Sequence, residues 1–348
     1  MLTEAEAIQR ITAGRFEFPP LEVVAAEPDP GSVAGGRPDL SLELGWQQQT
    51  ERFLVEYRSL GTPRRLQEAI AVARSYEGPD RRPMVMAPFL DEEWLERLAD
   101  AGISGLDFSG NGVVVVPGRW FVFRTGRPNA FPSGSYIQDI YRGRSSFVPR
   151  VLLVRPDFDQ VTAVREEILR RGGEVSLSTV SKVLSRLEED LLISREDGVE
   201  LIQPARLLDR FVDAYSGPDV RRRTAGRVPD VEAALRRALE TAEREGVALV
   251  GKAEGVYAPF PGAEGSVTLF TDDVEALLPA IGMEETRRFP DIELVETDEE
   301  SVYFDARRRD GFVWTSPVET YLQLAAGGKR EQEVAEQLRD ALLSRTFD

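Results

Sequence analysis

Short apolar runs alternate with helical spacing through the first 145 residues of the chain. Residues 37–44 place apolar side chains at every second position, and residues 52–58 follow as a hairpin partner, which predicts two paired strands. Pro63 predicts the start of a helix, and a second helix is expected over residues 92–101. Further strands are expected at residues 83–88, 106–108 and 113–116. Strands joined by helices in this way predict a mixed α/β domain.

Helical spacing dominates the next part of the chain, up to residue 216. Helices are expected over residues 147–154, 158–171 and 174–187. The third has a single apolar stripe, made of Val180, Val183, Leu184 and Leu187. Two short strands, residues 191–195 and 199–202, follow around the turn Glu196-Asp197-Gly198. Three helices and a two-stranded ribbon in this order predict a winged helix-turn-helix.

The remaining residues return to mixed strands and helices. Helices are expected over residues 230–245, before Gly282 and over 331–344, and strands at 247–251, 266–270, 292–295 and 301–305. Stretches rich in Gly, Pro and Ser or Arg, at residues 125–149 and 216–229, predict boundaries. The chain is therefore expected to be an α/β multidomain protein, with domains at 1–145, 146–216 and 229–348 and a linker at 217–228.

Composition narrows the chemistry that the chain can perform. It has no cysteine and no histidine, which excludes disulfides, thiol nucleophiles, Ser-His-Asp triads and imidazole metal ligands. The net charge is −17, and residues 224–348 hold 26 acidic against 14 basic residues. Such an acidic chain argues against non-specific coating of nucleic acid, but it allows one local basic face. No leader or membrane-spanning run is visible, so a cytoplasmic protein without a membrane partner is expected.

The polar side of the helix expected at 174–187 is the clearest candidate site. It carries hydroxyls and cations near its start: Ser178, Thr179, Ser181, Lys182 and Arg186. Short hydroxyl side chains let a helix N-terminus approach phosphates and base edges. The segment resembles the recognition helix of bacterial winged helix-turn-helix regulators, which implies contact with double-stranded DNA by these residues and by Arg195 in the ribbon. The alternative is a winged helix used for dimerisation or protein docking, with its serines as caps.

The run Arg221-Arg222-Arg223 is open to two interpretations as well. It could add a contact with the DNA backbone from the linker, or be a solvated linker segment.

The N-terminal block resembles the PD-(D/E)XK nuclease-like fold. The resemblance rests on Pro38-Asp39, Glu56-Tyr57-Arg58, the helix at Pro63 and the segments 84–88 and 105–111. It implies that Asp39 and Glu56 would hold Mg²⁺, which activates water against a phosphodiester. Arg58 replaces the family's lysine, and a guanidinium cannot deprotonate water. The alternatives are a working nuclease, an inactive or binding-only relative and an unrelated α/β domain. Asp107 and Asn111 are expected to be turn residues that bond to their own backbone.

The last block resembles the C-terminal part of AbiEi-type antitoxins and regulators. The segments 248–251, 313–324 and 327–329 carry the resemblance, which implies a nucleotidyltransferase-like α/β domain. Lys252 follows Gly251 where an active enzyme needs Ser, and Asp272 and Asp273 are adjacent, so they would point to opposite faces of a strand. Nucleotidyl transfer is therefore not expected.

The leading hypothesis is a DNA-binding transcriptional regulator of antitoxin type, without cofactor or catalytic activity. Expected partners are double-stranded DNA, a toxin protein bound by the acidic C-terminal domain, and a second copy of the chain. One alternative is a Mg²⁺-dependent nuclease that uses Asp39 and Glu56, with Arg58 beside them. Another is a protein-interaction module that does not bind DNA.

Overall fold

A computed structural model describes residues 2–33, 36–131, 140–253, 256–257, 266–286 and 288–344. The chain forms two compact units, Met1–Gln138 and Asp139–Asp348. It is a mixed α/β protein. The first predicted boundary includes residues 132–139, which lie outside the described residues, and the further division of the second unit into domains stays a prediction. No helix among the described residues has the length and apolar character to cross a membrane.

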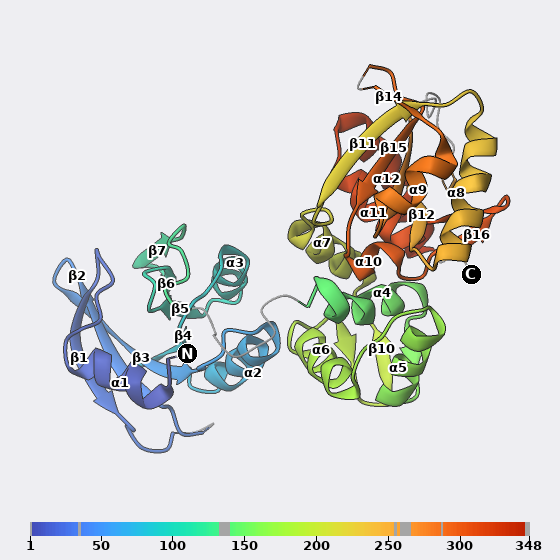
Figure 1. Cartoon of the computed structure of the whole chain (residues 1–348). Coiled ribbons are helices and arrows are strands. Elements are labelled where there is room, and N and C mark those ends of the chain that lie inside the picture. The colour runs from blue at the N-terminus through green and yellow to red at the C-terminus, as the bar shows by residue number, and fades with distance from the viewer. Residues whose placement is uncertain are drawn as a thin grey trace. The chain divides into compact units, whose positions relative to one another are not determined.

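A seven-stranded sheet forms the centre of the first unit (Figure 1). Its strands lie in chain order: β1 (Glu22–Pro28), β2 (Leu40–Trp46), β3 (Gln49–Tyr57), β4 (Arg82–Ala87), β5 (Ser104–Asp107), β6 (Gly112–Val116) and β7 (Trp120–Arg124). β3, β4 and β5 run parallel to one another, and the other neighbours are antiparallel. The predicted hairpin is confirmed, with Leu40 opposite Val55. β1 and β7, the two edge strands, are additional to the predicted elements.

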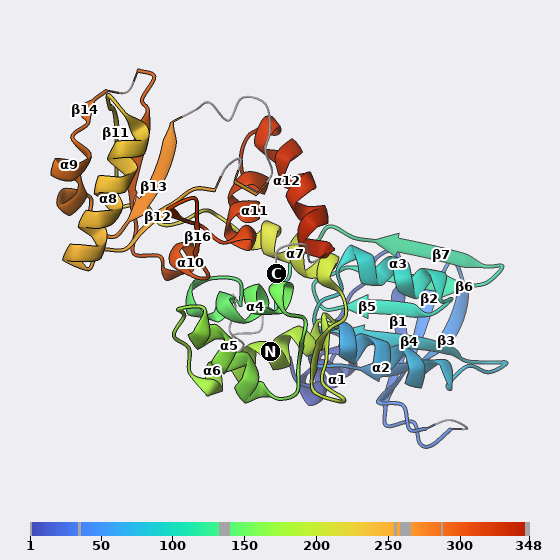
Figure 2. The same cartoon turned by 90° about the vertical axis from the view of Figure 1, so that its right-hand side faces the viewer.

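Helices cover both faces of this sheet. They are α1 (Glu4–Thr12), α2 (Pro63–Arg74) and α3 (Glu92–Asp100). Along β3, Phe53 and Val55 pack with residues of α1, whereas Leu54 packs with residues of α2 and α3. α2 and α3 make the crossovers between the parallel strands and lie together on one face (Figures 1 and 2). This alternation places Glu56, the next residue on the Leu54 face, on the side that α2 covers.

The second unit starts with a helical part that contains one small sheet. Its elements are η1 (Gly143–Ser146), α4 (Phe147–Val154), β8 (Asp157–Phe158), α5 (Val161–Arg170), α6 (Leu177–Glu189), β9 (Ile193–Ser194), β10 (Val199–Leu201) and α7 (Pro204–Ala214). The small sheet has the order β8-β10-β9, and both pairings are antiparallel. The prediction that Phe158 begins a helix is wrong: Phe158 pairs with Val199 in β8, and α5 begins three residues later.

The rest of the second unit is built on another seven-stranded sheet. The strands are β11 (Arg222–Arg227), β12 (Leu249–Gly251), β13 (Val267–Thr271), β14 (Glu284–Glu285), β15 (Ile292–Glu296), β16 (Arg307–Arg309) and β17 (Phe312–Trp314), in the order β14-β11-β15-β13-β12-β17-β16. The segment expected as a linker, residues 217–228, therefore contains β11. This strand pairs with β15 on one side and with β14 on the other.

Helices pack on this sheet and extend from it (Figure 2). They are α8 (Val231–Glu245), α9 (Val274–Ile281), α10 (Glu300–Tyr303), α11 (Pro317–Ala325) and α12 (Lys329–Leu343). α8 and α9 share one core cluster with the sheet, and Val302 of α10 packs in a second cluster with Val250, Phe270 and Val295. The strand predicted at residues 301–305 is wrong, because Glu300–Tyr303 forms a helical turn instead.

Candidate functional site

The sequence-predicted polar helix is α6, and its start is fixed by a local cap. The Ser176 hydroxyl accepts the Thr179 backbone N–H at 3.1 Å, which leaves Leu177 as the first helical residue. The predicted apolar stripe, Val180, Val183, Leu184 and Leu187, is buried. The stripe therefore fixes which side of α6 packs on the unit and which side faces out.

The outward side of the N-terminal half of α6 carries hydroxyls and one lysine. Ser178 and Lys182 are exposed, and Thr179 and Ser181 are half-buried. Lys182 forms no ion pair with any side chain in the part of the chain that the structure describes. The hydroxyls and the ammonium at this end of the helix can reach an anionic partner.

The C-terminal half of α6 is electrostatically different. Arg186 pairs with Asp190, Nε to Oδ2 at 3.0 Å, and Arg195 of the ribbon lies 3.8 Å from Glu188 and donates to the Ser185 hydroxyl at 3.3 Å. Burial raises the pKa of Asp190, although Arg186 opposes that shift. The two arginines predicted to bind DNA are thus engaged by carboxylates of their own unit.

The three arginines around the start of β11, Arg221 to Arg223, also form ion pairs within the unit. Arg221 pairs with Asp298, Arg222 pairs with Glu275, and Arg223 Nη1 lies 3.0 Å from Glu293 Oε1. Arg222 and Arg223 are exposed, but they belong to β11, so these two residues are part of a strand and not of an unstructured linker. Their acidic partners come from elements far away in sequence, which local composition does not reveal.

In the first unit, the structure brings Asp39 and Glu56 to neighbouring positions. Asp39 directly precedes β2, and its Oδ2 accepts the Tyr57 backbone N–H at 2.8 Å. Glu56 is buried near the end of β3, where Arg58 Nη1 lies 2.5 Å from Oε1 and the Tyr76 hydroxyl donates to Oε2 at 2.5 Å. Both Glu56 oxygens are therefore occupied. Tyr76, which follows α2, is a partner that the sequence prediction missed.

The pKa of Asp39 reflects this setting. Burial raises it from the usual 3.8 to about 6, the negative charge of Glu56 adds to the rise, and the Tyr57 N–H and Arg58 oppose it. Among the described residues, no three carboxylates gather closely enough to hold a metal ion. Two carboxylates, one of them already paired with a guanidinium, are a poor fit to Mg²⁺, which prefers several free oxygen ligands.

Two other acidic positions from the sequence have structural roles. Asp107 accepts the backbone N–H groups of Leu90, Ser109, Gly110 and Asn111 and the Asn111 side-chain amide, which confirms the predicted turn. Asp272 accepts the Ala248 N–H at 2.8 Å, and Asp273 caps α9 through the Ala276 N–H at 3.1 Å.

The part after β12 differs from a nucleotide-binding turn in one further respect. Lys252 pairs with Glu331 at 2.9 Å, so its ammonium is held by α12. Comparisons with family models, with curated proteins and with solved structures found no match for this chain.

Proposed function

We propose that this chain is a DNA-binding transcriptional regulator that contacts duplex DNA through a winged helix formed by α4 to β10. The observation that carries the proposal is the outward-facing pair Ser178 and Lys182 on the N-terminal half of α6. Recognition helices contact base edges with their N-terminal residues while the preceding helix crosses the backbone.

The order of elements supports this proposal. α4, β8, α5, α6, β9 and β10 follow one another in the chain, and the strand order β8-β10-β9 makes the last two strands a ribbon beside α6. α6 has 13 residues. At a rise of 1.5 Å per residue its length is about 20 Å, and a helix of that kind fits the major groove.

The side chains at the exposed N-terminal end of α6 suit contact with a DNA groove better than contact with a membrane or with a generally anionic surface. Ser178 and Ser181 can donate to phosphates or to base edges, and Lys182 adds one positive charge. Leu177 is 44% exposed at the first helical position, where its methyl groups suit contact with a thymine methyl. The wing turn carries exposed Glu196 and Asp197, so the ribbon contributes little attraction to phosphates.

The experiment measures binding of the full chain to fluorescein-labelled duplexes from the upstream region of its own gene, at low salt. We expect Lys182→Ala to weaken binding by about tenfold, because a charge-assisted contact is worth 1.5–3 kcal/mol. Lys329→Ala is the matched control: it removes the same charge from an exposed position at the start of α12 and should leave binding unchanged. Equal effects of the two variants, or no binding of any upstream duplex, would contradict the proposal.

Loss of DNA binding would favour the docking alternative, in which α6 contacts a protein. Glu188, Glu189 and the acidic wing turn fit that use better than DNA contact. The resemblance to AbiEi-type antitoxins adds the expectation of a toxin partner for the acidic C-terminal part. Co-purification of the chain with the product of a gene in the same operon tests that part of the proposal.

A metal-dependent nuclease is the second candidate, and it rests on the neighbouring carboxylates Asp39 and Glu56. The Arg58 pair and the Tyr76 hydrogen bond weaken it, since a metal ion would have to displace both from Glu56. Incubation of plasmid with the chain and Mg²⁺ or Mn²⁺ decides the matter. Cleavage that disappears in Asp39→Ala supports the nuclease, and no cleavage, or cleavage that survives the substitution, discards it.

A further inference from the structure

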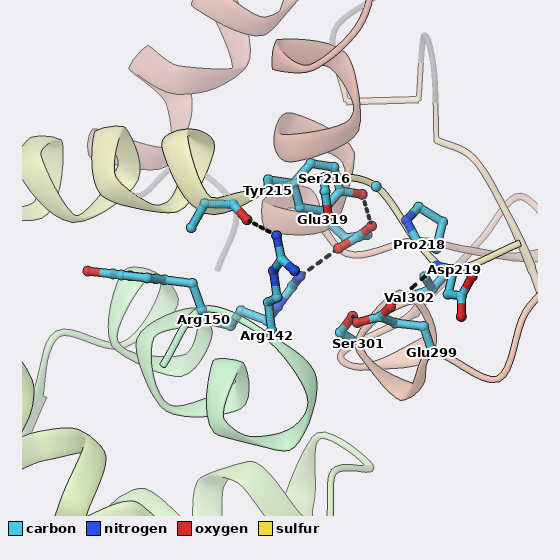
Figure 3. Close-up of a pocket in the computed structure, with 13 residues that line it drawn as sticks. Arg142, Arg150, Tyr215, Ser216, Pro218, Asp219, Glu299, Ser301, Val302 and Glu319 are labelled. Carbon is cyan, nitrogen blue, oxygen red and sulfur yellow. Dashed lines mark hydrogen bonds and ion pairs between the residues drawn. The ribbon is translucent and has the colours of Figure 1, made fainter. Parts of the chain in front are cut away.

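A cavity of about 420 Å³ lies within the second unit (Figure 3). Its walls come from the two residues before η1, from α4, from the end of α7 and the chain just after it, and from α10 and α11. The volume is in the range of small-molecule sites in proteins, which begins near 300 Å³. Nothing in the DNA-binding proposal uses this space.

The inner wall of the cavity contains a buried ion pair with spare hydrogen-bonding capacity. Arg150 on α4 is 3% exposed, and its Nη2 lies 2.7 Å from Glu319 Oε2 on α11. Glu319 Oε1 accepts the Tyr215 hydroxyl at 2.7 Å and the Gln323 amide at 2.9 Å, so that carboxylate is fully engaged. In contrast, Arg150 Nε and Nη1 are buried without a hydrogen-bond partner among the described residues.

Two unpaired guanidinium nitrogens at a buried position call for an acceptor. Leaving a buried charged donor without one is costly, and native proteins satisfy nearly all such groups. The Phe211 ring, 5.2 Å from the guanidinium carbon, offers only the weaker cation–π attraction. In the part of the chain that the structure describes, Glu319 is the one acceptor of Arg150, so the charge of the guanidinium is incompletely compensated there. A carboxylate matches the planar fork of an arginine.

The opposite wall has the reverse charge. Glu299 accepts the Ser301 hydroxyl at 3.2 Å and the Asp219 backbone N–H at 3.5 Å, both at the long end of the hydrogen-bond range. The Asp219 side chain lines the same wall and is exposed at the rim (Figure 3). The wall itself neutralises the charges of the Glu299 and Asp219 carboxylates weakly or not at all, so these two groups suit a bound ammonium group.

We propose that this cavity binds a small zwitterion of the α-amino acid class. The ligand carboxylate faces Arg150 and Arg142, the two cations of the lining, and its ammonium donates to Glu299 and Asp219. Arg142 at the rim lines the carboxylate side and strengthens the attraction. A molecule with a single charge satisfies only one wall, so both charges are needed for affinity. This inference does not depend on whether α6 contacts DNA.

The experiment measures binding to the full chain by calorimetry, with the twenty common amino acids as probes. Acetate and ethylamine are the single-charge counterparts, and inorganic phosphate tests for a simple anion site. We expect at least one amino acid to bind about tenfold or more tightly than acetate, ethylamine or phosphate. If no amino acid binds, or if acetate or phosphate binds as tightly as the best amino acid, the proposal is overturned.

Two neighbouring substitutions place the site in the cavity. Glu299→Gln keeps the shape and removes the charge that faces the ammonium, so the best amino acid should bind about tenfold more weakly. Glu300→Gln is the matched control, because Glu300 pairs with Arg144 and does not line the cavity. Both variants keep the Arg150–Glu319 pair and are therefore expected to fold. An equal loss of affinity in the two variants, or no loss in Glu299→Gln, would also overturn the proposal.

Discussion

Asp39 makes stability of the first unit depend on pH in a direction opposite to that of most carboxylates. Its pKa is raised from 3.8 to about 6 in the folded chain, chiefly by burial. Well below pH 3.8 the Asp39 carboxyl is protonated in the folded and unfolded states, so its burial does not lower the free energy of unfolding through ionisation. As the pH rises, the unfolded chain loses this proton first, so the folded state loses stability until the pH passes about 6.

The magnitude follows from the two pKa values. A difference between 3.8 and about 6 corresponds to about 3 kcal/mol at pH 8, which is the upper limit for the gain from a neutral replacement. Asp39→Asn is that replacement, because an amide oxygen can still accept the Tyr57 N–H. We expect the variant to unfold with the same free energy as the parent chain below about pH 3 and to be more stable by up to about 3 kcal/mol at pH 8.

Urea unfolding followed by tryptophan fluorescence measures this difference. Three of the four tryptophans, Trp46, Trp94 and Trp120, belong to the first unit, so the fluorescence change reports mainly on it. Glu96→Gln is the control, because Glu96 is exposed on α3 and its replacement should change stability little at either pH. An Asp39→Asn variant that is no more stable than the parent at pH 8, or that gains its stability only at low pH, would refute the argument.

Three further substitutions test the packing and the buried polar groups. Asp107→Ala removes the acceptor of four backbone N–H groups and should cost about 3 kcal/mol or more in urea unfolding; a smaller loss would mean that water replaces the carboxylate. Gly173→Ala would place a Cβ 2.7 Å from the Phe304 ring, so calorimetry should show a loss of about 1–3 kcal/mol, and an unchanged melting temperature would show that the ring can move. Glu319→Gln leaves the Arg150 charge unpaired and should cost about 3 kcal/mol or more, whereas a neutral outcome would show that solvent reaches the guanidinium.

The sequence pattern predicts those elements whose caps and pairing partners lie close to them in the sequence. β2, β3 and β4 alternate buried side chains on two core clusters, and α8 has an aspartate cap and a glycine at its end. α8 and β4 lie within one residue of their expected ranges, whereas the ends of β2 and β3 differ from theirs by up to three residues. α1 was missed, although its start carries a capping box between Thr3 and Glu6 that is visible in the sequence. The spacing of apolar residues therefore identifies a helix or a strand only in segments longer than one helical turn.

Residues 301–305 form a segment that is too short for the spacing of its apolar residues to distinguish a helix from a strand. Val302 and Phe304 are both buried and two apart, as in a strand, yet the segment is one helical turn followed by extended backbone. Five residues do not separate the two periods. β11 was taken for a linker for a different reason. Its Ala and Gly residues have little strand propensity, and the strand exists because β15, about 70 residues later, pairs with it.

The candidate site was predicted better in its position than in its charges. The helix, its apolar stripe and the exposed Ser178 and Lys182 agree with the sequence interpretation. The sequence analysis does not predict the pairing of Arg186 with Asp190, although residues four apart on a helix are neighbours, because it ends the helix at residue 187. The cavity around Arg150 is not visible in the sequence, since Arg150 and its partner Glu319 are 169 residues apart.

The salt dependence of DNA binding distinguishes the contributions of Lys182 and Arg186 of α6 to phosphate binding. It also tests whether an ion pair within the chain reduces such a contribution. Each phosphate neutralised contributes about −0.9 to the slope of log K against log salt. Lys182 has no partner among the described side chains, so Lys182→Ala should reduce the size of the slope by about 1. Arg186→Ala should reduce it by much less, because the guanidinium is already held by Asp190. Anisotropy titrations between 50 and 200 mM salt, the range over which phosphate contacts lose most of their affinity, measure both slopes. If the two variants lower the slope equally, the Arg186–Asp190 pair opens on DNA, and the two halves of α6 contribute equally to phosphate binding.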